Sequence, residues 1–70
     1  MLVIDGVEYI NIEFVANTMP DRRGVIGAGR LWAPSETIEA AKAATELVLD
    51  GTAIVITASS DHRSISFKPA

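Results

Sequence analysis

The strongest constraint on this chain is that its 70 residues include no cysteine. A domain this short hides only about 60% of the surface that its extended chain would expose, so its core is small. Disulfides and Cys-ligated metals, which often stabilise small domains, are both excluded here. Stability must therefore come from close packing or self-association. Because 49% of the residues are hydrophobic, we expect one packed domain over residues 1–70 rather than disorder.

The chain is mildly acidic. Its formal net charge is −3 at pH 7, so it lacks the positive surface that direct, non-specific nucleic-acid binding requires. The first residues do not have the basic and apolar segments of a signal peptide, and no apolar run approaches the roughly 20 residues that cross a bilayer. We therefore expect a cytoplasmic protein with no membrane partner.

Residues 35–50 predict an amphipathic helix. Pro34 favours extended geometry before it, Ser35 can cap its first turn, and Gly51 follows it as a left-handed C-terminal residue. A helical period places apolar side chains on one face and charged side chains on the other. The apolar face contains Ile38, Ala41, Ala44, Val48 and Leu49. The charged face contains Glu36, Glu39, Lys42, Glu46 and Asp50.

The last third of the chain predicts a β-hairpin. Residues 53–58 are mainly apolar and β-branched on both sides, as in a strand inside a sheet. Residues 63–68 alternate, with Ile65 and Phe67 on one face. The polar residues 59–62 supply the turn between the two strands.

The first part of the chain favours strands but leaves an alternative open. Asp5-Gly6 predicts a two-residue hairpin turn between residues 2–4 and 7–9. Residues 10–16 alternate as a strand, and their β-branched and aromatic content favours that interpretation. Helical spacing within residues 11–19 keeps a helix as the alternative.

A polar loop over residues 17–24 precedes a predicted strand over residues 25–32, which would pair back on the strand of residues 10–16. Gly27 and Gly29 would form bends or bulges in it. No internal repeat is evident. The expected fold class is α+β: a small antiparallel β-sheet of about four strands in ββαββ order, with a short N-terminal hairpin and one amphipathic helix packed on one face.

A single helix leaves the second face of such a sheet open. Ala53 and Val55, joined by Val15, would line this face, and exposed apolar surface on so small a domain usually marks an interface. We therefore expect Ala53 and Val55 to support self-association as a homodimer.

Two motifs resemble catalytic or cofactor sites but fail when their spacing is considered. Gly27 and Gly29 resemble the start of a dinucleotide-binding fingerprint, yet the position that needs a third small residue is Trp32. Residues 59–62 contain serine, aspartate and histidine, but four neighbours in a turn cannot line up as a triad. His62 has no second histidine or cysteine to share a metal. We expect no enzyme activity, no metal and no cofactor.

The charged and aromatic residues indicate binding instead. Arginine and tryptophan are favoured at protein interfaces, although Trp32 could equally close one end of the core. The carboxylates of the helix could form an acidic ridge that meets a basic partner, although a solvated helix face is the alternative. The candidate partner-binding residues are Arg22, Arg23, Arg30, Trp32, Glu39, Glu46 and Asp50.

The order and composition of the last forty or so residues resemble those of small phage-encoded anti-CRISPR proteins, which are often acidic single domains with one helix against an antiparallel sheet. The resemblance rests on the segments 30–35, 39–44 and 52–56. These inhibitors share no common residue pattern, so no functional residue is carried over.

The resemblance implies a non-enzymatic inhibitor in the bacterial cytoplasm. Its partner would be a protein, in particular a nucleoprotein complex such as CRISPR-Cas or another defence nuclease, whose access to nucleic acid it would block. The alternative is a structural or assembly protein that acts through homo-oligomerisation.

Overall fold

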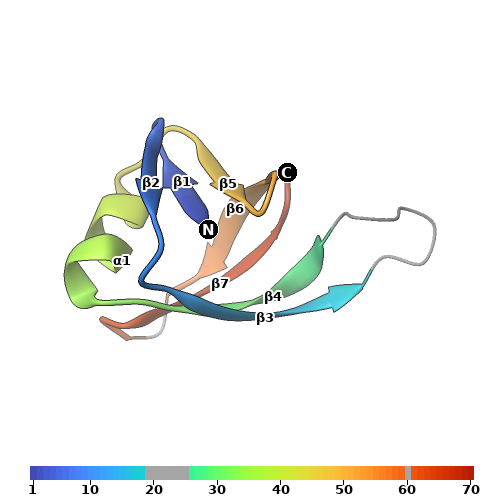
Figure 1. Cartoon of the computed structure of the whole chain (residues 1–70). Coiled ribbons are helices and arrows are strands. Elements are labelled where there is room, and N and C mark those ends of the chain that lie inside the picture. Colours follow the sequence, from blue (N-terminus) through green and yellow to red (C-terminus); the bar gives the residue numbers. More distant parts are fainter. Residues whose placement is uncertain (19–25, 60) are drawn as a thin grey trace.

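The computed structural model describes residues 1–18, 26–59 and 61–70. Strands hold 56% of these residues and helix only 13%, so the fold is mostly β and the predicted α+β class is wrong. Seven strands, all antiparallel, form one sheet that curls into a half-barrel (Figure 1).

The sheet has the strand order β2-β1-β5-β6-β7-β4-β3. The predicted ββαββ sheet of about four strands is therefore also wrong: the leading hairpin belongs to the same sheet, and one further strand, β5, follows the helix. In chain order the elements are β1 (Leu2–Ile4), β2 (Val7–Tyr9), β3 (Glu13–Thr18), β4 (Ile26–Trp32), α1 (Ser35–Lys42), β5 (Leu47–Leu49), β6 (Thr52–Ala58) and β7 (Ser64–Pro69).

Three predicted strand pairs are confirmed. β1 pairs with β2, β3 with β4, and β6 with β7, each antiparallel. Strand β3 also decides the alternative left open for residues 11–19, where the structure has a strand and no helix in the described residues 11–18.

The helix is the main correction. It begins where predicted but ends at Lys42 instead of running to residue 50, and Pro34 occupies its N-cap without any side-chain hydrogen bond. Ile38 and Ala41 are buried, as the helical period predicted. Among the described residues, no helix has the length and apolar character to cross a bilayer.

The expectation of no internal repeat is wrong, because a short hairpin sequence occurs twice and its second copy follows the helix. Residues 2–7 read Leu-Val-Ile-Asp-Gly-Val, and residues 47–52 read Leu-Val-Leu-Asp-Gly-Thr. Both Asp-Gly pairs have positive φ, 47° and 86° in the first turn and 46° and 83° in the second, as the two-residue turn of a tight hairpin requires. Gly51 is thus left-handed, as predicted, but it closes a hairpin rather than a helix.

The two hairpins pair with each other through β1 and β5. Val3 lies opposite Val48 at the centre of the pair, so an approximate two-fold axis relates the hairpins. Leu2 and Leu49, which are also partners, are both fully buried. The β1–β5 pair therefore builds part of the core.

Reciprocal hydrogen bonds join the two turns. The Asp5 N–H donates to the Glu46 carbonyl and the Asp50 N–H to the Met1 carbonyl, both at 3.0 Å. The Asp5 carboxylate also accepts the N–H groups of Thr45 at 3.0 Å and Glu46 at 2.8 Å. In a continued helix these two N–H groups would bond carbonyls four residues earlier. The Asp5 carboxylate takes both donors instead, which favours the observed end of the helix.

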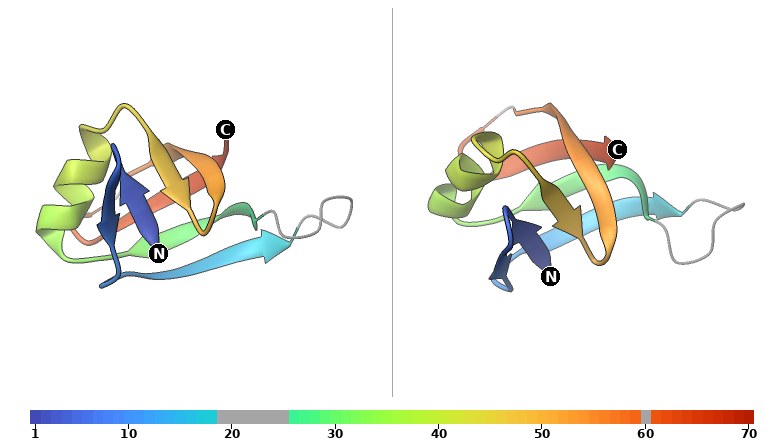
Figure 2. Two further views of the ribbon diagram at one scale, coloured as in Figure 1. Left: turned by 45° about the horizontal axis from the view of Figure 1, so that its top comes forward. Right: turned by 90° about the horizontal axis from the view of Figure 1, so that it is seen from above.

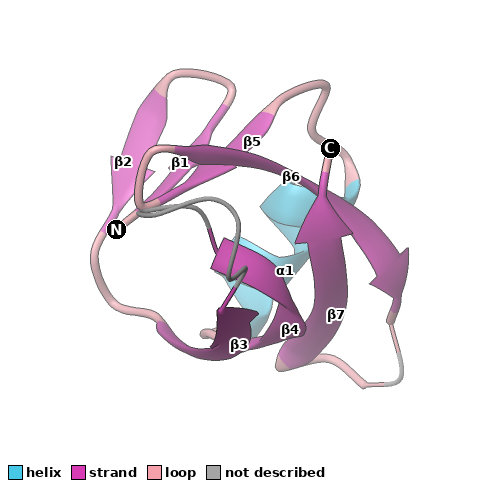
Figure 3. Cartoon of the chain, turned by 90° about the vertical axis from the view of Figure 1, so that its right-hand side faces the viewer, coloured by secondary structure: helices cyan, strands magenta, loops and turns pink. Residues whose placement is uncertain are grey.

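The core lies on the concave side of the sheet, and α1 covers one end of the curl (Figures 1 and 3). The rings of Phe14 and Phe67 meet edge to face with their centroids 6.4 Å apart. The buried hydrophobic residues are Leu2, Ile4, Leu31, Ala33, Ile38, Ala41, Leu47, Leu49, Ile54, Ile65 and Phe67.

Strands β3 and β4 approach each other unusually closely. A Cβ atom added to Gly29 would overlap the Val15 carbonyl oxygen and the Ala16 Cα atom. The pairing shifts register between Ala16 and Thr18, opposite the part of β4 that contains Gly27 and Gly29. The predicted irregularity at these glycines is confirmed.

We predict that Asp5→Ala lowers the free energy of unfolding by roughly 2 kcal/mol, because it removes the acceptor of two N–H groups and puts alanine at positive φ. Asp5→Asn keeps an acceptor oxygen and tolerates this backbone conformation, so its loss should be less than half as large. Urea denaturation measures both values. Equal losses in the two variants would contradict the role assigned to the carboxylate.

Candidate functional site

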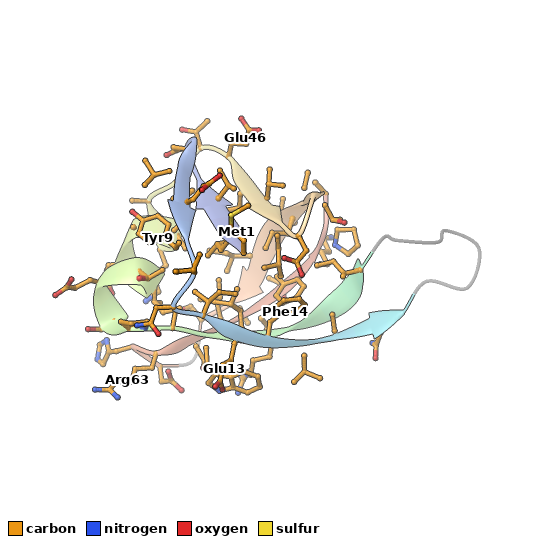
Figure 4. All side chains as sticks on the ribbon, in the orientation of Figure 1. Met1, Tyr9, Glu13, Phe14, Glu46 and Arg63 are labelled. Atoms are coloured by element: carbon orange, nitrogen blue, oxygen red, sulfur yellow. The ribbon has the colours of Figure 1, made fainter. Side chains whose placement is uncertain are left out.

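The convex face of the sheet carries side chains that no helix covers. Strand alternation sends one side chain into the half-barrel and the next one out. Figure 4 shows this for neighbours on β3, where Phe14 points into the half-barrel and Glu13 points away from it. The outward residues of the central strands therefore form a surface on a rigid support.

Register places these outward residues side by side. Glu13 lies opposite Trp32, and Val15 lies opposite Arg30. On the other side of the sheet's centre, Val55 lies opposite Lys68. We call this surface the convex patch; it consists of Glu13, Val15, Arg30, Trp32, Val55 and Lys68.

The apolar members of the convex patch are open to solvent. Val15 is 65% exposed, and Trp32 and Val55 are each 40% exposed. Val15, Ala53 and Val55 are all exposed, as predicted, although the four-stranded sheet whose open face they would line is wrong, and their role in self-association stays a prediction. The alternative role for Trp32, as a core residue, is wrong.

The neighbour of Trp32 on strand β7 is a buried, hydrogen-bonded serine. This residue, Ser64, is fully buried although alternation places it on the outward side of the strand. The Ser64 hydroxyl donates to Asp61 Oδ2 at 3.0 Å. In the sheet, Trp32 thus lies between Glu13 on β3 and the hydrogen-bonded, buried Ser64 on β7.

Asp61 organises the turn before β7. Its Oδ1 accepts the Arg63 N–H at 2.7 Å, and its Oδ2 accepts the Ser64 hydroxyl. The hydrogen bond from the Arg63 backbone lowers the pKa of Asp61 most, and the one from the Ser64 hydroxyl lowers it further. The charge of Arg30 adds a smaller effect in the same direction. The prediction that residues 59–62 form a turn agrees with this local bonding, although Ser60 lies outside the described residues.

The described cations divide between two parts of the molecule. Arg30, Arg63 and Lys68 lie on β4, on β7 or in the bend before it. Lys42 lies on α1, where its Nζ is 3.5 Å from Glu39 Oε1. The predicted contact residues Arg22 and Arg23 lie outside the described residues.

The predicted acidic ridge is wrong, because its members do not share a helix. Glu39 is on α1, Glu46 is in the segment before β5, and Asp50 is in the turn after it. Asp50 Oδ1 accepts a hydrogen bond from the Met1 nitrogen at 2.5 Å. Figure 4 shows Glu46 at the opposite side of the molecule from Glu13, so the Glu46 carboxylate lies apart from the convex patch.

A hollow of about 190 Å³ lies between the end of α1 and β6. It is lined by Lys42 and Thr45 and by the hydrophobic residues Ala41, Ala44, Leu47, Ile54, Val55 and Ile56. Ligand pockets usually measure roughly 300 Å³ or more. Within the described ranges, no three His, Cys, Asp or Glu side chains come together as metal ligands would.

Comparisons with known proteins found no match, whether with family models, curated proteins or solved structures. The segments that resemble anti-CRISPR proteins are arranged differently from the expectation, because α1 ends at Lys42 and β5 precedes residues 52–56. The resemblance itself stays a prediction.

We predict that Asp61→Asn removes a pH-dependent contribution to stability. Because the pKa of Asp61 is lowered in the folded state, its ionised form stabilises the fold above the model-peptide value of 3.8, and this contribution is lost as the pH falls through the folded-state pKa. The difference in unfolding free energy between the natural protein and the variant should therefore shrink towards low pH. Urea titrations from neutral to acidic pH measure this difference. Ser64→Ala removes only one of the two hydrogen bonds to the Asp61 carboxylate, so its pH-dependent loss of stability should be smaller. A difference that stays constant with pH would contradict the assignment.

Proposed function

We propose that this chain is a non-enzymatic binding protein that docks on a protein partner through the convex patch. The observation that carries the proposal is Trp32, a large aromatic side chain that is 40% exposed on the face of a sheet and has Arg30 on the same strand. Tryptophan and arginine are the residues that most often supply the binding energy of protein interfaces. A rigid support adds to this because little ordering is needed on binding.

The composition of the patch indicates the chemistry of its partner. Val15 and Val55 supply apolar area, and the patch has two cations, Arg30 and Lys68, against one carboxylate, Glu13, in a chain whose net charge is −3. A complementary surface would have an apolar pocket for the indole and acidic groups nearby. The carboxylates on the other side of the molecule would favour this orientation of approach and would repel nucleic acid.

Two finer points rest on sequence alone. We propose the cytoplasm as the place of action and, following the resemblance to phage-encoded inhibitors, a bacterial CRISPR-Cas or other defence nuclease complex as the partner. Enzyme activity and a cofactor are not part of the proposal, since the convex patch supports recognition without either.

We predict that Trp32→Ala reduces capture of the partner at least about tenfold, because it truncates the anchor of the patch. The immobilised protein is exposed to lysate from bacteria that carry an active CRISPR-Cas system, and bound proteins are quantified by mass spectrometry. Val7→Ala is the matched control, because Val7 is 56% exposed on β2, outside the patch. The control should bind the partner as the natural protein does.

The proposal fails if every captured protein binds the natural chain and Trp32→Ala equally, while circular dichroism shows that both are folded. The same variants, added to a purified effector complex, test the partner's identity. Inhibition of target cleavage by the natural chain and not by Trp32→Ala would support a defence complex. No inhibition by either would contradict it.

A further inference from the structure

Among the strands that the structure describes, β3 is an edge of the sheet along its whole length. It contains six residues and has a single neighbour, β4, in the sheet order. Figure 2 shows it as the outer strand on its side of the half-barrel. An edge strand has a row of backbone N–H and C=O groups that can pair with another strand.

The two edges of this sheet differ in how well they are protected. The other edge, β2, is only three residues long and has Glu8 at its centre. Strand β3 contains no lysine or proline, and its one charged residue, Glu13, is at its beginning. Val15 near its middle is 65% exposed, and Phe14 beside it is only partly buried. Thus β3 has few of the features that natural proteins use to block edge pairing.

We propose that β3 pairs antiparallel with β3 of a second copy of this chain, about a two-fold axis through Val15. The sheet would then continue from one copy into the other, in an isologous dimer. The inference goes beyond the proposed function and does not depend on it, because it concerns the purified chain alone.

The sequence of β3 is self-complementary in this register. Val15 meets Val15 of the second copy on the convex face. Glu13 meets Asn17, a hydrogen-bonding partner without like charge, and Phe14 meets the small Ala16 on the concave face. None of these pairs sets like charges opposite each other, which would destabilise the pairing.

Neighbouring registers fit less well. An axis through Phe14 would oppose two phenylalanines, which is a favourable pair, but it would place the Glu13 carboxylate against the apolar Val15 twice. An axis through Ala16 would place Val15 against Asn17. Self-pairing of β2 about its centre would set Glu8 against Glu8, and like charges directly opposite each other destabilise a strand pair. A second copy at β3 is therefore the occupant that the chain's own residues favour.

The dimer would place the two convex patches on one continuous face. Pairing about an axis perpendicular to the sheet keeps the outward side of each copy outward, with Val15 at the junction. Residues Ala53 and Val55 on β6 are separated from β3 by β7 and β4. The homodimer interface predicted from those two residues would be a different one, and the two can be distinguished.

Sedimentation equilibrium over a hundredfold range of concentration, up to about 1 mM, tests the proposal. We expect the natural chain to dimerise and Val15→Lys to raise the dissociation constant at least about tenfold, because two lysines would then face each other on the axis. The side chain is exposed, so the fold should persist. Val7→Lys, on the β2 edge, and Val55→Lys, on β6, should dimerise as the natural chain does.

A second variant tests the register through a gain. Asn17→Lys would place a lysine opposite Glu13 of the other copy, twice per dimer, and should lower the dissociation constant several-fold at low salt and less at high salt. The proposal is overturned if the natural chain stays monomeric throughout, if Val15→Lys dimerises unchanged, or if Asn17→Lys weakens the dimer. Loss of the dimer in Val55→Lys alone would instead assign the interface to β6.

Discussion

The pairing of β1 with β5 is the interaction on which the rest of the structure depends. It joins the N-terminal hairpin to the hairpin that follows the helix, and it is the only strand pair that connects β2 and β1 to the remaining strands of the described sheet. Leu2 and Leu49 become fully buried as partners in it. The Asp5 carboxylate stabilises the same junction, because it accepts the N–H groups of Thr45 and Glu46, the two residues immediately before β5.

The length of the helix follows from this pairing. Because residues 47–49 enter the sheet, the helix has only eight residues and covers one end of the concave side. The outward side of β4 and its neighbours has no helical cover among the described elements. Trp32 is therefore displayed on a sheet whose inner side holds Leu31 and Phe67 in the core. The short helix is a result of this strand pairing, whereas Trp32 is exposed because it lies on the outward side of β4.

Local signals in the sequence predicted most of the strands. Asp5-Gly6 has few alternatives to a tight turn, and residues 64–68 alternate clearly, so both hairpins were correct. The segment 47–49 was different, because its two leucines and valine continue the apolar face of a helix as well as they form a strand. Gly51 did not discriminate either, since a helix end and a hairpin turn both need a left-handed residue. The repeat of residues 2–7 at 47–52 was the sequence signal that could have identified residues 47–49 as a strand.

In the candidate site, too, features that depend on residue type and alternation could be predicted, whereas those that depend on strand register or on the length of the helix could not. Arg30, Trp32 and Val55 were predicted from residue type and alternation, and the structure places all three on one face. Glu13, whose position opposite Trp32 depends on the register of β3, could not be paired with it from the sequence. Glu39, Glu46 and Asp50 were grouped only because a long helix was expected. Because the helix ends at Lys42, the three residues lie on different elements.

The most direct test of this account is a nuclear Overhauser measurement between β1 and β5. The hydrogen bonds from Asp5 to Glu46 and from Asp50 to Met1 make Leu2 and Leu49 a pair without mutual hydrogen bonds, in which Cα atoms lie closest. The account predicts a strong cross-peak between the Hα protons of Leu2 and Leu49. Its absence, together with helical connectivities three residues apart through residues 43–50, would contradict it.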